Sequence, residues 1–156
     1  TVTNNIIWGT AAFALHLYPD AQGNTITHNV IDDNGYGAIF GGDAGPANTV
    51  SDGNTVQYNV VADSNAGYNV SSSGDASATS NVFTYNCTYN SPSSGTGDDI
   101  SNSGGFTTAA NVSGSSPQFA NASAHTVAGY ELQSGSPCLS VVGYDTASAL
   151  AGGSSP

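Results

Sequence analysis

The sequence of 156 residues contains no lysine, no arginine and no methionine, and only one tryptophan. Its eleven aspartate and glutamate residues therefore meet no cationic side chain except three histidines, and no salt bridge to Lys or Arg can form. Nucleic-acid phosphates and anionic lipid headgroups are bound mainly through Lys and Arg. The composition thus disfavours nucleic-acid partners and electrostatic membrane attachment.

Long apolar runs are missing as well. The longest patch, residues 11–15, is far shorter than the roughly 20 residues of a membrane-spanning helix, so we expect no membrane insertion. Helix-forming Leu, Lys, Glu and Arg are scarce or absent, which predicts very little helix. The remaining partners to expect are neutral or cationic molecules, or molecules that a metal ion bridges.

What the sequence does contain is a short pattern that returns along most of its length. Its fullest copy runs from Gly53 to Asp63, and another runs from Ile26 to Asp33. The copies recur every 24 to 30 residues, a period typical of solenoids, propellers and other repeat arrays. One copy cannot bury a hydrophobic face alone, but stacked copies share a core. The fixed position of the pattern is an asparagine, found at Asn5, Asn29, Asn59, Asn86 and Asn111.

The recurring unit Gly-Asn-Thr-Val/Ile-x-x-Asn-Val-Val/Ile resembles the secreted right-handed parallel β-helix proteins of the pectate-lyase-like fold. Near the C-terminus, Pro117-x-Phe119 followed by Tyr130-x-Leu132-x-x-Gly-Ser-Pro is similar to the closing segment of many bacterial members. The resemblance identifies an architecture and leaves the activity open, because this fold hosts lyases, hydrolases, epimerases, adhesins and tail spikes.

The resemblance implies an all-β chain, a right-handed parallel β-helix (solenoid) of about four to five rungs with an irregular C-terminal cap. Stacked asparagines would form a ladder, each amide donating and accepting between rungs roughly 4.8 Å apart. We expect rungs over residues 1–114, a capping segment over 115–150 that covers the last rung, and a linker-like tail over 151–156.

Cysteines and glycosylation motifs both suit a secreted or cell-surface protein. A bridge between Cys87 and Cys138 would tie a late repeat to the C-terminal region, worth roughly 4 kcal/mol in the chain-entropy description; two unpaired buried thiols are the alternative. Asn-x-Ser/Thr motifs also arise by chance in a chain so rich in these residues. The candidate N-glycosylation sites are Asn69, Asn86, Asn111 and Asn121.

Aligning the copies on the fixed asparagine places His28, Tyr58 and Tyr85 in one column. Facing outward, such a column would be an aromatic strip of the kind that packs against sugar rings; facing inward, it would belong to the core. The sequence leaves both interpretations open, because the bend beside the asparagine obscures which side chains alternate outward.

The same alignment places Asp33 and Asp63 about one rung apart. Two carboxylates at that distance repel, which raises the pKa of one of them or recruits a cation such as Ca²⁺, the one candidate cofactor. The alternative is an ordinary acidic turn that is exposed to solvent. Paired acids also suit glycosidase chemistry. Asp98 and Asp99 faintly resemble the paired aspartates of β-helix polygalacturonases, although the accompanying Asn-Thr-Asp, Gly-His-Gly and Arg-x-Lys motifs are absent.

The composition and the motifs leave two hypotheses about function. The first hypothesis is an extracellular non-catalytic β-helix scaffold for surface or filament assembly, end to end or lateral with other copies, or for contact with neutral polysaccharide. The alternative is the C-terminal fragment of a secreted polysaccharide-degrading enzyme, a lyase or inverting glycoside hydrolase, whose catalytic rungs lie upstream. Either way, the lack of Met and of a charged leader predicts a piece of something longer.

Overall fold

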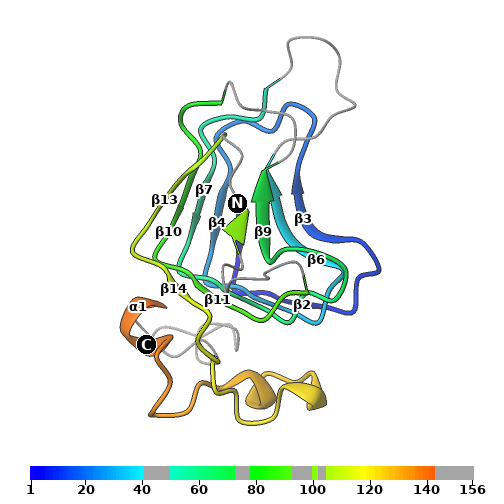
Figure 1. Cartoon of the computed structure of the whole chain (residues 1–156), viewed down its shortest axis with the longest axis vertical. Coiled ribbons are helices and arrows are strands. Elements are labelled where there is room, and N and C mark those ends of the chain that lie inside the picture. Colours follow the sequence, from blue (N-terminus) through cyan, green and yellow to red (C-terminus); the bar gives the residue numbers. More distant parts are fainter. Residues whose placement is uncertain (41–49, 73–77, 93–99, 102–104, 143–156) are drawn as a thin grey trace.

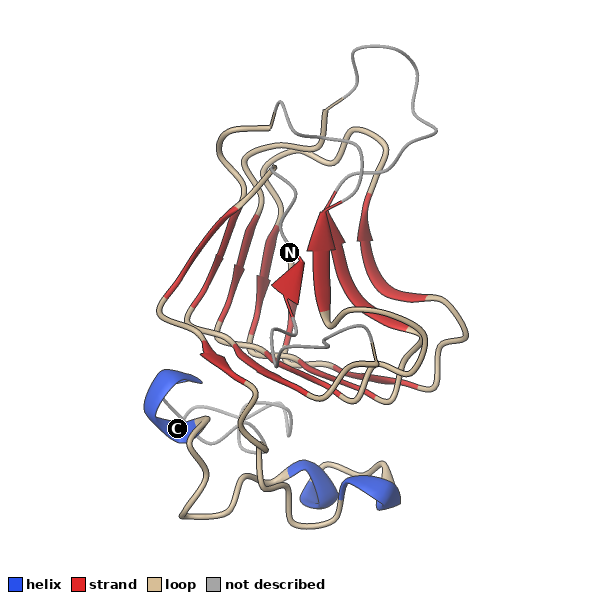
Figure 2. Ribbon diagram, in the orientation of Figure 1, coloured by secondary structure: helices blue, strands red, loops and turns tan. Residues whose placement is uncertain are grey.

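The computed structural model describes residues 1–40, 50–72, 78–92, 100–101 and 105–142, which form a parallel β-solenoid with three sheets (Figures 1 and 2). Sheet A contains β1 (Val2–Thr3), β4 (Thr25–Thr27), β7 (Thr55–Gln57), β10 (Val82–Thr84) and β13 (Thr107–Ala109). Sheet B contains β2 (Ile6–Trp8), β5 (Val30–Asp32), β8 (Val60–Ala62), β11 (Cys87–Tyr89) and β14 (Val112–Ser113). Sheet C contains β3 (Phe13–Leu17), β6 (Tyr36–Phe40), β9 (Val70–Ser72) and β12 (Ile100–Ser101).

The chain visits the three sheets in turn, so each rung is one strand from each sheet. Neighbouring rungs pair in parallel: Ile26 of β4 is in register with Val56 of β7, and Val30 of β5 with Val60 of β8. Four complete rungs, β1–β3 to β10–β12, are followed by the pair β13 and β14. The predicted all-β parallel solenoid is confirmed.

The interior of the solenoid is one continuous apolar column. Ile26, Val56 and Phe83 occupy equivalent positions in sheet A and are at most 1% exposed. Phe40 from sheet C stacks on Phe106, with ring centroids 4.8 Å apart. Short strands of β-branched and aromatic residues suit this pleated, narrow core, and each rung contributes too little apolar surface to fold alone.

The predicted asparagine ladder runs along the corner between sheets A and B. The backbone N–H and the Nδ2 of Asn59 both donate to Oδ1 of Asn86, at 2.9 and 3.0 Å, and those of Asn29 donate in the same way to Asn59. Asn29, Asn59 and Asn86 are fully buried, and Asn5 and Asn111 continue the bonds at the ends. Buried amides thus satisfy one another from rung to rung.

A second ladder lies at the corner that leads into sheet A. Asn24 donates to Asn54 through its backbone N–H and Nδ2, and Asn54 donates in the same way to Asn81. The sequence did not predict this second ladder, although the repeated Gly-Asn-Thr at Gly23 and Gly53 marks its position. Both glycines have positive φ, which turns the chain just before the asparagine.

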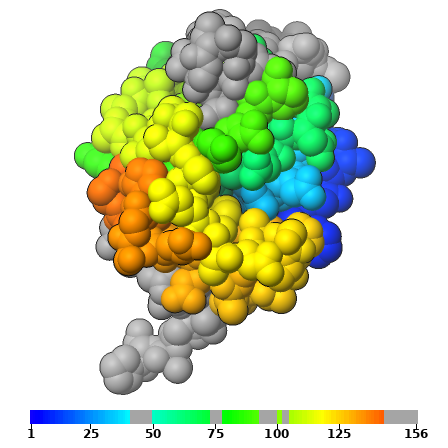
Figure 3. All heavy atoms as spheres, turned by 60° about the horizontal axis from the view of Figure 1, so that its bottom comes forward, coloured from blue at the N-terminus to red at the C-terminus, as the bar shows by residue number. Residues whose placement is uncertain are grey.

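The C-terminal segment is irregular, as expected, and contains η1 (Ala122–Ala124), η2 (Ala128–Tyr130) and the single turn α1 (Leu139–Val142). We call its described part, residues 115–142, the strap. It was expected to cover the last rung; instead it lies along the side of the solenoid, against the outer face of sheet B (Figures 1 and 3). No helix among the described residues is long and apolar enough to cross a membrane. The predicted tail, 151–156, lies outside the described residues.

Candidate functional site

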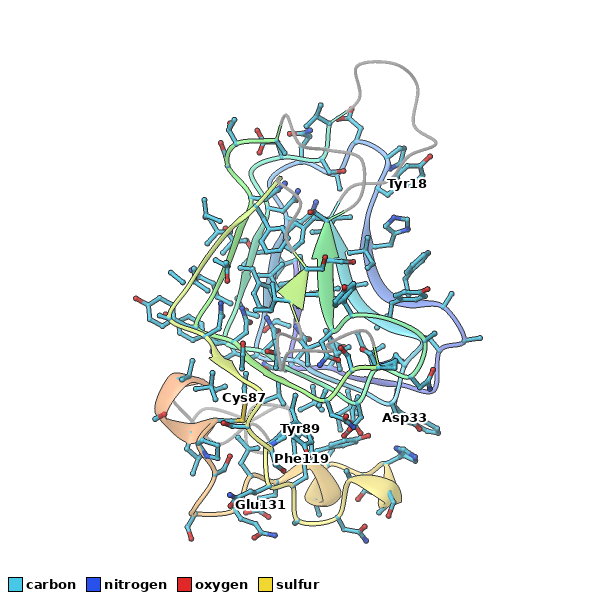
Figure 4. All side chains as sticks on the ribbon, in the orientation of Figure 1. Tyr18, Asp33, Cys87, Tyr89, Phe119 and Glu131 are labelled. Atoms are coloured by element: carbon cyan, nitrogen blue, oxygen red, sulfur yellow. A yellow bond between two sulfur atoms is a disulfide. The ribbon has the colours of Figure 1, made fainter. Side chains whose placement is uncertain are left out.

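A second apolar layer lies outside the solenoid, between sheet B and the strap. On sheet B it is formed by Val30, Val60 and Cys87, all fully buried. Cys87 is joined to Cys138 of the strap, so the predicted disulfide is confirmed (Figure 4). The strap's share of the layer consists of Tyr130, Leu132, Cys138 and Val142. Both faces of sheet B are therefore buried, as in parallel sheets that other elements cover on both sides.

The most distinctive polar group in the structure lies within this layer. The hydroxyl of Tyr130 donates to Oδ2 of Asp32 at 3.0 Å, and Nδ1 of His125 lies 3.0 Å from the same hydroxyl. Because that hydroxyl has a single proton and gives it to Asp32, the second bond requires a proton on Nδ1 of His125. His125, Tyr130 and Asp32 therefore form one directed chain of hydrogen bonds.

The carboxyl of Asp32 is only 3% exposed, and its Oδ1 has no hydrogen-bond partner among the described residues. Burial raises the pKa of Asp32 to about 6, and the carboxylates of Asp63 and Asp33 add to the rise, while the bond from Tyr130 opposes it. A protonated Asp32 can also donate to Asp63, which favours the neutral form further. Burial and the same carboxylates raise the pKa of Tyr130.

The strap is also fastened to the first rung. Trp8, at the end of β2, stacks on His125 with ring centroids 4.0 Å apart and planes 8° from parallel. The strap thus touches rung one through Trp8, rung two through Asp32 and rung four through Cys87. Figure 3 shows it crossing the rungs in this way. The disulfide was predicted from the sequence; the contacts through Trp8 and Asp32 were not, because each pairs residues that belong to no common repeat.

Asp33 and Asp63, the predicted acid pair, follow β5 and β8 at equivalent positions of neighbouring rungs, with φ of 51° at both (Figure 4 labels Asp33). Each is held by an amide: Asn65 donates to Asp33 at 3.3 Å and Asn90 to Asp63 at 2.6 Å. Within the described ranges, no three His, Cys, Asp or Glu side chains gather as metal ligands would. The other catalytic candidates, Asp98 and Asp99, lie outside the described residues.

The column of His28, Tyr58 and Tyr85 lies on the outside of the corner between sheets A and B. Its rings stack nearly parallel, with centroids 5.3 and 5.6 Å apart. Tyr58 therefore has a ring stacked on each side. Tyr85, at the end of the column, is 45% exposed and neighbours Ala110 of the next rung on its other side. Burial lowers the pKa of His28 to about 4.

A second aromatic group, missed by sequence reasoning, lies on and beside sheet C. We call it the β3 track. Phe13 is 43% exposed and contacts His16 at 4.7 Å and Tyr36 of the next rung at 5.2 Å, at angles of 49° and 43°. Tyr18 stacks on His16 at 5.0 Å. Figure 4 shows Tyr18 at the end of the molecule opposite the strap. The missed signal was the aromatic density between Phe13 and Tyr18.

The four glycosylation motifs differ in access. Asn69 and Asn86 are fully buried, and their Nδ2 groups donate within the fold to the carbonyls of Tyr89 and Val56. A sugar on either amide is incompatible with the folded rungs. Asn111 is half-buried within the ladder, and Asn121, at the start of η1, is exposed.

Comparison with known proteins agrees with this geometry. A family model described as a right-handed beta helix region matches residues 1–83, just over half of the chain. That match covers the first three rungs and ends within β10. Searches against curated proteins and against solved structures gave no match.

Proposed function

Since the chain belongs to the right-handed β-helix family, we propose that it is a non-catalytic extracellular scaffold that contacts neutral polysaccharide. The observation that carries the proposal is a difference in solvent exposure between the aromatic rings and the acid of raised pKa. Aromatic rings are exposed on two surfaces of a rigid solenoid, while the acid with the raised pKa is buried beneath the strap. A disulfide between rung four and the strap supports an oxidising, extracellular setting.

The arrangement of acids supports a non-catalytic role. A general acid has to reach the proton acceptor of its substrate, and the 3% exposure of Asp32 leaves no such access while the strap is in place. Asp33 and Asp63 are engaged by Asn65 and Asn90. The sequence also offers no Lys or Arg to stabilise a developing anion or to bind a uronate carboxylate.

The exposed rings supply the recognition chemistry. Phe13 is 43% exposed, and the apolar faces of sugar rings pack on such aromatic surfaces. The formal net charge of −11 at pH 7 disfavours acidic polysaccharides, which the protein would repel. A neutral glycan meets no such barrier.

Affinity electrophoresis through gels that contain neutral or acidic polysaccharides tests this proposal. We expect retardation in at least one neutral gel, none in polyuronate gels, and no reducing ends or unsaturated products, with or without Ca²⁺. Turnover, or migration unaffected by every neutral glycan, would overturn the proposal.

A polysaccharide-degrading enzyme is the second candidate, and one observation favours it: a carboxyl with a pKa near 6, in Asp32, lies beside the acids Asp33 and Asp63. A carboxyl of raised pKa with a second carboxyl group beside it is what acid–base glycoside hydrolysis uses. Activity that appears when the strap is loosened by reduction, and disappears in Asp32→Asn, would select this candidate over the scaffold.

Self-assembly is a further role that a scaffold of this kind can have. β13, at one edge of sheet A, is exposed at all three residues. Pairing with another copy would cover this edge. Light scattering across a concentration series tests it, with growth of particle mass as the expected result.

A further inference from the structure

We propose that the glycan-binding surface is the β3 track, formed by Phe13, His16, Tyr18 and Tyr36, and not the predicted column of His28, Tyr58 and Tyr85. The ligand class is a neutral polysaccharide whose sugar rings lie along β3 and across to β6. This inference rests on the proposed function and names the site that performs it.

Orientation of the rings distinguishes the two surfaces. In the column, Tyr58 is stacked between two nearly parallel rings, at 9° and 21°, so a ring lies against each of its faces. In the track, the neighbours of Phe13 are tilted by 43° and 49°, so neither ring lies flat on it. Packing of a sugar on an aromatic side chain needs exposed ring surface, and Phe13, 43% exposed with no ring stacked parallel to it among the described residues, supplies it.

The strand beneath the track is firmly held. Leu15 and Leu17 of β3 point into the apolar interior, where Leu17 is 9% exposed, while Phe13 and His16 are exposed to solvent. β3 pairs with β6 over Leu15, His16 and Leu17 as well as at Phe13. The rings are therefore carried by a paired strand of the solenoid, and binding loses little conformational entropy at the site.

Tyr36 is positioned by a glycine on the next rung. A Cβ atom added at Gly67 would overlap Cε1 of Tyr36, so the ring occupies the space that the side chain of any other residue would fill. Gly67 thus allows Tyr36 to lie against the solenoid beside Phe13. Substituting Gly67 with alanine has to displace the ring while leaving all four aromatic side chains present.

The chemistry of the track fits an uncharged ligand. It combines apolar ring surface with the hydroxyls of Tyr18 and Tyr36 and the imidazole of His16, groups that can bond to sugar hydroxyls. The whole sequence has no Lys or Arg to attract an acidic chain, and Asp20 follows Tyr18 closely. The apolar patch with a polar rim is the kind that marks an interaction site.

The test measures retardation in the neutral gel that best retains the wild type, for the double variant Phe13→Ala/His16→Ala, for Gly67→Ala, and for Tyr85→Ala as the matched aromatic control. We expect the double variant to lose roughly tenfold in affinity, in line with the loss of two ring contacts. Gly67→Ala should weaken binding by a smaller factor, and Tyr85→Ala should bind like the wild type. Thermal unfolding of each variant, compared with the wild type, verifies that the rungs are intact.

Each outcome has a distinct meaning. Loss of binding in Tyr85→Ala with none in the folded track variants would overturn the assignment and leave the glycan-binding function standing. Full binding by both the track variants and Tyr85→Ala would equally overturn it. A wild type that binds no neutral glycan would overturn the proposed function itself, and this inference with it.

Discussion

The rungs and the strap are stabilised in different ways. In the rungs, the ladder bonds and the strand pairing recur: Asn29 bonds to Asn59 as Asn59 bonds to Asn86, and the buried Ile26 has Val56 as its counterpart one rung on. In the strap, each contact with the solenoid occurs once, through Cys138, Tyr130 and His125. Loss of a single contact should therefore be shared along the rungs but be felt in full by the strap.

Removing the disulfide is the change expected to have the largest effect. The double variant Cys87→Ala/Cys138→Ala opens a loop closed over 51 residues, which corresponds to about 4 kcal/mol of unfolding free energy in the chain-entropy description. Urea unfolding of the oxidised wild type and the variant measures the difference. Equal midpoints would mean that the other contacts alone hold the strap in place, which would contradict the claim that the strap depends on each single contact.

Within the rungs, the largest effect should come from the centre of the ladder. Asn59→Ala removes bonds to Asn86 and to the carbonyls of Ile26 and Gln57, and leaves buried groups without partners, at a cost of about 3 kcal/mol. Asn111→Ala, at the half-buried last rung, is the matched control and should cost less than half as much. Equal losses in chemical denaturation would show that the ladder does not depend on burial.

The contrast explains how much could be predicted from the sequence. The fixed asparagine and the spacing of its copies predicted the solenoid and the ladder, because recurring contacts leave a recurring pattern. The disulfide was predicted because the chain has only two cysteines. The contacts that place the strap against sheet B do not repeat along the sequence, so they leave no such pattern. The sequence instead led us to expect the C-terminal segment over the last rung.

The candidate site shows the same division. The repeat predicts that His28, Tyr58 and Tyr85 form one column. It does not predict that the column faces outward, because the φ near +58° at each residue breaks the alternation of side chains. Asp33 and Asp63 were the candidate acid pair from the sequence, with a solvated acidic turn as the alternative. The buried acid proved to be Asp32, one residue away, since only the strap creates its surroundings.

The buried carboxyl gives the strap a pH dependence that the ladder lacks. The pKa of Asp32 is about 6 in the folded protein, against an ordinary value of 3.8, so its contribution to stability is fully present below about pH 4 and is lost as the pH rises through 6. At pH 7 the loss is at most about 3 kcal/mol. Asp32→Asn should flatten the pH profile of unfolding between pH 4 and 7; an unchanged profile would contradict the assignment.

The smallest effect is expected at the stack that joins the strap to the first rung. Trp8→Ala removes the ring on which His125 packs, worth about 1 kcal/mol, while Trp8→Phe should restore most of it. Thermal unfolding at pH 7 measures both. A loss equal to that of Asn59→Ala would place the main attachment of the strap at rung one and not at the disulfide.

Hydrogen exchange at the backbone amide of Asn59 tests the central claim most directly. This N–H donates to the side chain of Asn86, 27 residues further along the chain, so it is protected only if successive rungs lie on one another. The structure predicts exchange as slow as global unfolding allows, in both the oxidised and the reduced protein. Exchange at the rate of an unprotected amide would contradict the stacked-rung account.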